Sequence, residues 1–242
     1  MTNSTPTSPR TFEDARRWAL IGAELISDAV AGLDDTGYAA PTALPGWTRA
    51  HVAAHVAANA EALSNLVHWA ATGEPTPMYA SPEERAAGIE RGRALPAAEL
   101  TAWLRRSADA LEARMDRLTD EQWRHDVVTA QGRTVPATEL PWMRSREVCV
   151  HAVDLATGVS FAELPAGFLA ALCDDVAAKR AAAPGPAVTL KASAGGAWEL
   201  PGDGEPVEVT GELHAITAYL TGRDAGLRAA DGSPAPALAA WL

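Results

Sequence analysis

The chain of 242 residues is poor in cysteine, in cations and in long apolar segments. Its two cysteines, Cys149 and Cys173, are too few for a disulfide framework and favour the reducing cytoplasm. No run of about 18 uncharged apolar residues is present, so no membrane-spanning helix is expected. The first residues lack the apolar core of a signal peptide.

Lysine and arginine number 20 against 31 acidic residues, which gives the chain a net charge of −11. Because phosphate backbones and anionic membranes attract clustered cations, neither is an expected partner.

Hydrophobic residues make up 48% of the chain, which is enough to bury a core. Apolar residues recur at gaps of three and four, the period of an amphipathic helix, in four long segments. These segments cover residues 11–33, 48–73, 96–118 and 137–157. Thr48 and Ser81 are expected helix N-caps, Ser81 starting a further helix up to about residue 95. Asp34–Gly37 is expected to end the first segment, and residues 119–136 are expected to be irregular. The pattern predicts an antiparallel four-helix bundle.

The composition changes after Gly158. A helix is expected at 165–182 and another at 213–222, with short β-prone runs at 188–191, 197–200 and 207–210 between glycine and proline turns. The sequence therefore predicts an α+β fold with three parts. Residues 1–10 form a flexible N-terminus, 11–158 form the bundle and 159–242 form a smaller α/β domain.

Glu147 and His151 are the clearest chemical signal. Residues four apart on a helix are offset by only about 40° and rise about 6 Å, so both side chains project from one face and can grip one ion. Cys149 lies about 200° round from Glu147 and is a poor ligand candidate. A carboxylate and an imidazole on a buried face need a partner, which can be an ion or simply each other.

A third ligand is available on the second long segment, which carries His51 and His55. Facing helices of a bundle bring such groups into one core site, and two imidazoles with one carboxylate are an open zinc set. Spacing does not rank His51 against His55, because both lie on one face and one can be a ligand while the other caps the helix or supports the site. The same ligands suit iron(II) or nickel. The remaining histidines, His68, His125 and His214, are expected to be ordinary surface or packing residues.

Several stretches resemble the mycothiol-dependent maleylpyruvate isomerases. They are TALPGWTRAHVAAHV, HWAATGEPTPMYASPEER, TAQGRTVP, MRSREVCVHAVDL and YLTGRDAG, and together they span nearly the whole chain. The GWTRAHVAAHV stretch alone is shared with the wider DinB-like helical-bundle superfamily, whereas the others are more specific. The resemblance implies a DinB-like bundle followed by a small SCP2-like α/β domain.

The resemblance also implies site residues. A divalent metal ion, usually zinc, would be held by His55, Glu147 and His151, which selects the second histidine of HVAAH. Arg223, in the YLTGR stretch, would be a catalytic arginine of the C-terminal domain. Its planar fork suits a carboxylate of the substrate or of an enolate better than lysine does. The alternative is a helix C-terminal arginine that satisfies backbone carbonyls. The oligomeric state stays open and is compatible with a monomer.

The activity implied by the resemblance is the isomerisation of maleylpyruvate to fumarylpyruvate in gentisate breakdown, with mycothiol as thiol cofactor. A thiolate that adds to the conjugated alkene turns its double bond into a single bond that can rotate before the thiol leaves. Three other functions remain open on the residues. They are another mycothiol-dependent S-transfer, a metal-dependent hydrolysis without thiol, and ligand binding by a metal-stabilised bundle without catalysis.

Overall fold

The computed structural model describes residues 10–223, 225–239 and 241. The N-terminus expected to be flexible, 1–10, lies outside this range except for its last residue. The chain divides into two compact units, one of Phe12–Val159 and one of Ser160–Leu242 with the N-terminal segment. Each is described by itself below. No helix in the described part is long and apolar enough to cross a membrane.

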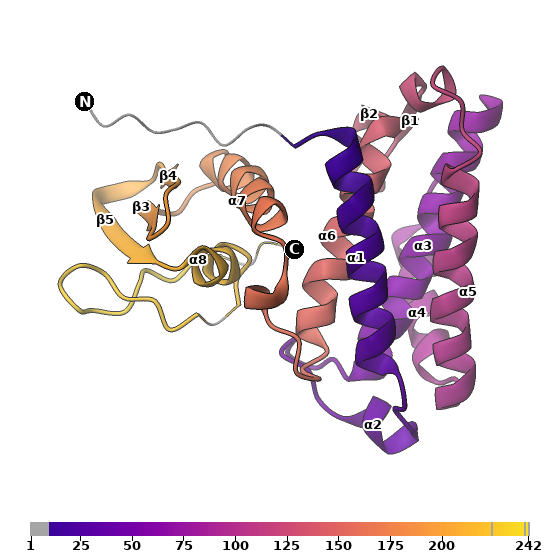
Figure 1. The fold of residues 1–242 in the computed structure, drawn as a ribbon, viewed down its shortest axis with the longest axis horizontal. Coiled ribbons are helices and arrows are strands. Elements are labelled where there is room, and N and C mark those ends of the chain that lie inside the picture. Colours follow the sequence, from indigo (N-terminus) through magenta and orange to yellow (C-terminus); the bar gives the residue numbers. More distant parts are fainter. Residues whose placement is uncertain (1–9, 224, 240, 242) are drawn as a thin grey trace. The chain divides into compact units, whose positions relative to one another are not determined.

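The first unit is built on four long helices that lie side by side (Figure 1). They are α1 (Phe12–Val30), α3 (Arg49–Thr72), α5 (Ala97–Met115) and α6 (Leu140–Asp154). Two shorter helices, α2 (Asp35–Ala39) and α4 (Pro82–Arg93), connect them. The α2 helix stands where the sequence predicts only an end to the first helix. Its cap explains this, because the side chain of Asp34 accepts a hydrogen bond from the Gly37 N–H at 2.7 Å.

The caps expected from the sequence set the ends of α3 and α4. Thr48 and His51 form a capping box at the start of α3, and Gly73 ends it in the left-handed region at φ +77°. Ser81 accepts a hydrogen bond from the Glu84 N–H at the start of α4. These caps set where α3 begins and ends, and α3 is the element that carries one side of the site.

Contacts between the long helices give their directions. Arg16 pairs with Asp116 and Ser27 with Arg105, so α1 and α5 are antiparallel. Likewise, α3 and α6 run in opposite directions, because Asn59 bonds Arg144 while His55 bonds Glu147. By contrast, α1 and α6 run in the same direction. Trp18 contacts Trp142, and further along both helices Gly22 lies against Val148. The bundle is therefore two parallel pairs, α1 with α6 and α3 with α5, and the pairs are antiparallel to each other.

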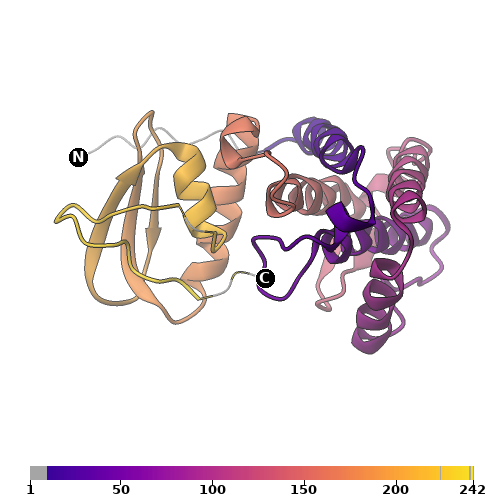
Figure 2. The same ribbon diagram turned by 90° about the horizontal axis from the view of Figure 1, so that it is seen from below.

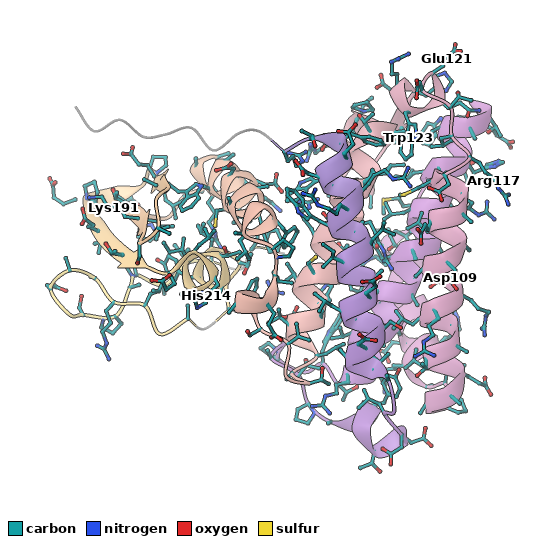
Figure 3. The ribbon with its side chains drawn as sticks, viewed as in Figure 1. Asp109, Arg117, Glu121, Trp123, Lys191 and His214 are labelled. Carbon is teal, nitrogen blue, oxygen red and sulfur yellow. The ribbon has the colours of Figure 1, made fainter. Side chains whose placement is uncertain are left out.

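The segment expected to be irregular, 119–136, is partly ordered into regular structure, and the expectation was wrong there. It contains a 3₁₀ turn, η1 (Gln122–Arg124), and two short antiparallel strands, β1 (Asp126–Val128) and β2 (Thr134–Pro136). Trp123, Val127 and Val135 are buried from this segment and join the core formed by α3, α5 and α6. Figure 3 labels Trp123 at this end of the bundle. The hairpin closes one end of the core.

The second unit contains a three-stranded sheet in the order β4-β3-β5, with β3 (Pro186–Ala192), β4 (Ala197–Leu200) and β5 (Asp203–Gly211). The β3–β4 pair is antiparallel and the β3–β5 pair is parallel. Helices α7 (Ala166–Ala181) and α8 (Leu213–Leu220) lie together on one face of the sheet (Figure 2). A short 3₁₀ turn, η3 (Phe161–Glu163), precedes α7 in the chain. The β5 strand begins four residues earlier than expected. The α+β fold class, a four-helix bundle with a small α/β unit, is confirmed.

Candidate metal centre

His55 lies on a helix that is buried along most of its length. Small residues dominate α3 and allow neighbouring helices to approach closely, so that His55 is only 6% exposed. A buried imidazole needs a polar partner. That partner comes from α6, which crosses α3 at this level: the Nε2 atom of His55 lies 2.9 Å from Oε2 of Glu147.

Glu147 and His151 project from one face of α6, as their spacing predicts. The His151 Nε2 atom lies 3.5 Å from the same oxygen of Glu147, and the two imidazole rings are 4.9 Å apart, edge to face. The ligand atoms of His55, Glu147 and His151 all lie within 4.8 Å of one another. In the described part of the chain no fourth histidine, cysteine or carboxylate belongs to this group. Three convergent donors can hold one cation and leave room for another ligand.

Asp154 orients His151 by contacting the ring nitrogen that faces away from the cluster. Its Oδ2 atom lies 2.8 Å from His151 Nδ1, and the Asp154 side chain is fully buried at the last turn of α6. A carboxylate on Nδ1 fixes the imidazole tautomer that leaves Nε2 facing the cluster. Asp154 is not among the residues predicted from the sequence, although its spacing of three from His151 on the same helix is a signal that points to it.

Charge is concentrated at the cluster. Burial alone would raise the pKa of the Glu147 carboxyl, but hydrogen bonds from both imidazoles outweigh it and hold that pKa well below its usual value. Burial lowers the pKa of His55, which keeps its ring neutral. Burial also lowers the pKa of His151, but the carboxylates of Asp154 and Glu147 outweigh this effect and raise that pKa to about 9. The proton that His151 holds on Nε2, facing Glu147, occupies a position that a divalent cation can take instead.

The structure separates the two histidines that spacing left unranked. His51 is the N3 residue of the capping box: its Nδ1 accepts a hydrogen bond from the Thr48 N–H at 3.0 Å. Its ring also stacks on Trp47 at 5.9 Å between centroids. His51 therefore helps to start α3, whereas His55, one turn later, faces Glu147.

Two further side chains border the cluster and were not found from the sequence. Arg85, on α4, approaches Nδ1 of His55 with its Nη2 atom at 3.4 Å. The Arg85 guanidinium also lies over the ring of Tyr79, 5.8 Å from its centroid. Both residues belong to the stretch HWAATGEPTPMYASPEER, but no spacing rule links a loop and a second helix to α3. Their position is a product of the tertiary fold.

Neither cysteine belongs to the cluster. The thiol of Cys149 points to the backbone oxygen of Trp18, 3.5 Å away, and burial raises its pKa to about 12. Burial also raises the pKa of Cys173 to about 12. Both side chains are fully buried, so neither is an ionised nucleophile at neutral pH.

The remaining histidines are accounted for by other contacts or by position. His125 bonds the carbonyl of Ala70 at 2.7 Å, and His68 lies 3.9 Å from Glu74 at the surface. His214 is at the start of α8 (Figure 3).

Arg223 belongs to the second unit, directly after α8. Its Nη1 atom donates to the carbonyl of Thr221 at 2.6 Å, and its guanidinium lies 6.0 Å from the ring centroid of Trp241. It also lines a cavity of about 250 Å³ with Tyr219 and Arg228. The Thr221 contact is the one expected of an arginine that satisfies carbonyls at a helix end. The structure brings together the three residues of the bundle, and Arg223 makes its contacts within the second unit.

The fold and the site together define a class: an α+β protein whose four-helix bundle brings together a buried histidine and a partly exposed glutamate and histidine as three convergent metal-type donors. The model of the mycothiol maleylpyruvate isomerase N-terminal domain matches residues 20–156 of this chain. The chain belongs to the mycothiol-dependent maleylpyruvate isomerase family of enzymes.

Two solved structures are similar to this chain over nearly its whole length. A crystal structure of a mycothiol-dependent maleylpyruvate isomerase is 36% identical, with a TM-score of 0.89, covering 95% of this chain and 97% of that one. A variant of such an isomerase, with one histidine replaced by alanine, is 35% identical with a TM-score of 0.90 and the same coverage. YfiT from Bacillus subtilis, described as a probable metal-dependent hydrolase, is 18% identical with a TM-score of 0.49 over 65% of this chain. No curated protein matches the chain.

Proposed function

We propose that the protein isomerises maleylpyruvate to fumarylpyruvate, with mycothiol as its thiol cofactor and with a divalent metal ion, zinc first, at His55, Glu147 and His151. One observation carries the proposal: these three side chains converge in a chain that belongs to the isomerase family. The reaction would be a step of gentisate breakdown. We place it in the cytoplasm, because both cysteines are free thiols.

The residues fit a divalent metal ion. Two imidazoles and one carboxylate are a common zinc ligand set with an open position, and the donor atoms already lie within 4.8 Å of one another. Asp154 behind His151 supplies the outer hydrogen bond that metal-binding histidines usually make. Imidazole and carboxylate also accept iron(II) and nickel, so zinc rests on the family resemblance.

When both are bound, mycothiol would supply a thiolate that adds reversibly to the conjugated double bond, and the cation would supply the Lewis acidity that ionises the thiol. The residues of this chain prepare that chemistry. His55, Glu147 and His151 would hold the cation between α3 and α6, and Asp154 keeps Nε2 of His151 turned inward. Burial of His55 at 6% exposure keeps water from competing on the α3 side.

Arg223 is proposed as the group that binds a carboxylate of the substrate. A protein with a net charge of −11 needs a local cation to hold a dicarboxylate, and a guanidinium binds carboxylate through two parallel hydrogen bonds. Arg223 lines a cavity of its unit that Arg228 also lines, and two guanidinium groups around one cavity support an anion-binding role.

The experiment is product analysis with the zinc-loaded protein, maleylpyruvate and either mycothiol or none. We expect fumarylpyruvate to form only with mycothiol, and the free thiol to be recovered in full. A stable thiol adduct would instead mean S-transfer. Isomerisation at the same rate without mycothiol would contradict the proposal.

A further inference from the structure

A groove runs along the bundle between α3, α4 and α5. Its volume is about 800 Å³, within the usual range for small-molecule sites. Its walls are polar and aromatic as well as apolar, and include Glu61, Asn65, Tyr79, Arg85, Arg91 and Trp103. All of these residues belong to the first unit, so the groove is complete within it.

The groove comes close to the metal centre at Arg85. Tyr79 and Arg85 line it, and Arg85 also approaches Nδ1 of His55 at 3.4 Å. On α3 the groove is lined by Ala58, Ala62 and Asn65, which follow His55 at spacings of three, seven and ten and therefore share its side of the helix. Ten residues of helix span about 15 Å. A ligand that lies along this stripe has one end beside Arg85, the groove residue that approaches His55.

The groove's side chains suit a neutral ligand rich in hydroxyl groups. Trp103 presents a partly exposed indole whose N–H donates to the carboxylate of Glu61 at 2.7 Å. Arg91 pairs with Glu84 at 2.5 Å on the opposite wall. Carboxylates and guanidinium groups alternate here, so hydroxyl groups find both acceptors and donors, whereas a phosphate would meet carboxylates on each side. An aromatic face beside them packs against the C–H face of a sugar ring.

We propose that this groove binds the sugar and inositol part of mycothiol and so directs its thiol to the metal centre. The proposal rests on the proposed function, because it assumes that mycothiol is the cofactor. Arg85 and Tyr79 then stand where the cysteinyl end passes from the groove to the metal centre. A ligand built as a thiol on a glycoside of two six-membered rings matches a groove between three helices with Arg85 and Tyr79, which border the metal centre, in its wall.

Gly88 offers a test that leaves the metal ligands untouched. It lines the groove from within α4, and a Cβ atom added to it would meet only Nη2 of Arg91, at 3.9 Å. Gly88→Leu should therefore fill the groove without strain, and the loss of a mid-helix glycine should favour α4. Gly88→Ala is the matched control, because it makes the same backbone change but leaves the groove open.

Binding is measured by calorimetry on the zinc-loaded protein, with mycothiol and with the thiol-free glucosaminyl-inositol as probes. We expect Gly88→Leu to raise the Kd of mycothiol about tenfold or more, with zinc content and melting temperature at least those of wild type. Gly88→Ala should bind mycothiol as wild type does. The thiol-free probe should bind wild type with or without zinc, and Gly88→Leu should weaken it in the same proportion.

A second pair of variants covers the case in which Gly88→Leu fails to fold. Arg106→Ala, in the groove, should weaken the binding of both probes, whereas Arg105→Ala, its neighbour on the far side of α5, should not. Equal affinity of wild type and Gly88→Leu for mycothiol would overturn the groove assignment alone. If wild-type protein does not bind mycothiol at all, the proposed function fails as well.

Discussion

Oδ2 of Asp154 lies 2.8 Å from Nδ1 of His151, at the buried end of α6. This contact sets the direction of the other ring nitrogen, Nε2, which lies 3.5 Å from Glu147. The i,i+4 pair on α6 is thus backed by an i,i+3 contact on the same helix. Two turns of helix therefore supply two of the three donors and the group that orients one of them.

Replacement of Asp154 tests this orientation. Asp154→Ala should lower zinc affinity about 10- to 100-fold, because His151 loses the partner that fixes its ring. Competition with a chromophoric chelator measures the change. Asp109→Ala, an exposed aspartate on α5 (Figure 3), removes the same charge away from the site and should leave affinity unchanged. Equal affinity of Asp154→Ala and Asp109→Ala would show that the contact does not support the metal.

The two histidines of HVAAH should behave in opposite ways. His51→Ala removes half of a capping box and should cost about 1 kcal/mol of folding free energy, while zinc binding persists. His55→Ala should abolish zinc binding while the protein stays helical. Urea unfolding of the zinc-free proteins and metal analysis separate the two effects. Loss of zinc from His51→Ala with retention in His55→Ala would reverse the assignment.

The long helices were predictable because each carries its own signal. Apolar spacing, Thr48, Ser81 and Gly73 are local features, and they set the extents of α3 and α4 closely. The β1 and β2 strands were not predictable in this way, since three-residue strands carry too little pattern and depend on packing against the core. The same holds for the parallel pairing of β3 with β5, which joins residues far apart in the chain.

The residues of the metal centre also differ in whether a local sequence pattern predicts them. Glu147 and His151 follow from helical geometry alone, because their relation lies within one turn. The choice of His55 over His51 came from the family resemblance, and the structure supplies a physical reason in the cap that His51 makes. Arg85 and Tyr79 carry no local signal, since a loop and a second helix bring them to α3. Contacts between elements are what spacing cannot reveal.

Replacement of Arg223 tests whether this residue acts in catalysis or only satisfies a backbone carbonyl at the end of α8. If it binds a substrate carboxylate, Arg223→Ala should lower kcat/KM about a hundredfold or more, with zinc content and mycothiol affinity unchanged. Steady-state kinetics and a thermal melt are measured together. Arg228→Ala, in the same cavity, controls for the loss of positive charge there. If Arg223→Ala has a lower melting temperature but full activity, the role of Arg223 is structural, through its contact with Thr221.

Close packing of α1 on α6 should also be visible in stability. A Cβ atom on Gly22 would clash with Cγ2 of Val148 and lie 2.7 Å from Sγ of Cys149. Gly22→Ala should therefore destabilise the protein by about 1–3 kcal/mol, although alanine favours helices. Gly88→Ala, with open space around it, should be neutral or stabilising by up to about 1 kcal/mol. Urea unfolding measures both, and equal stability of the two variants would contradict the packing described for α1 and α6.

Metal removal tests the central claim, that His55, Glu147 and His151 hold a catalytic cation. Purified protein is analysed for metal, stripped with a chelator, assayed with maleylpyruvate and mycothiol, and then given zinc again. The account predicts one equivalent of divalent metal per chain, loss of isomerisation on stripping and recovery on addition of zinc, with neither metal nor recovery in Glu147→Gln. Full mycothiol-dependent activity in the metal-free protein would contradict it.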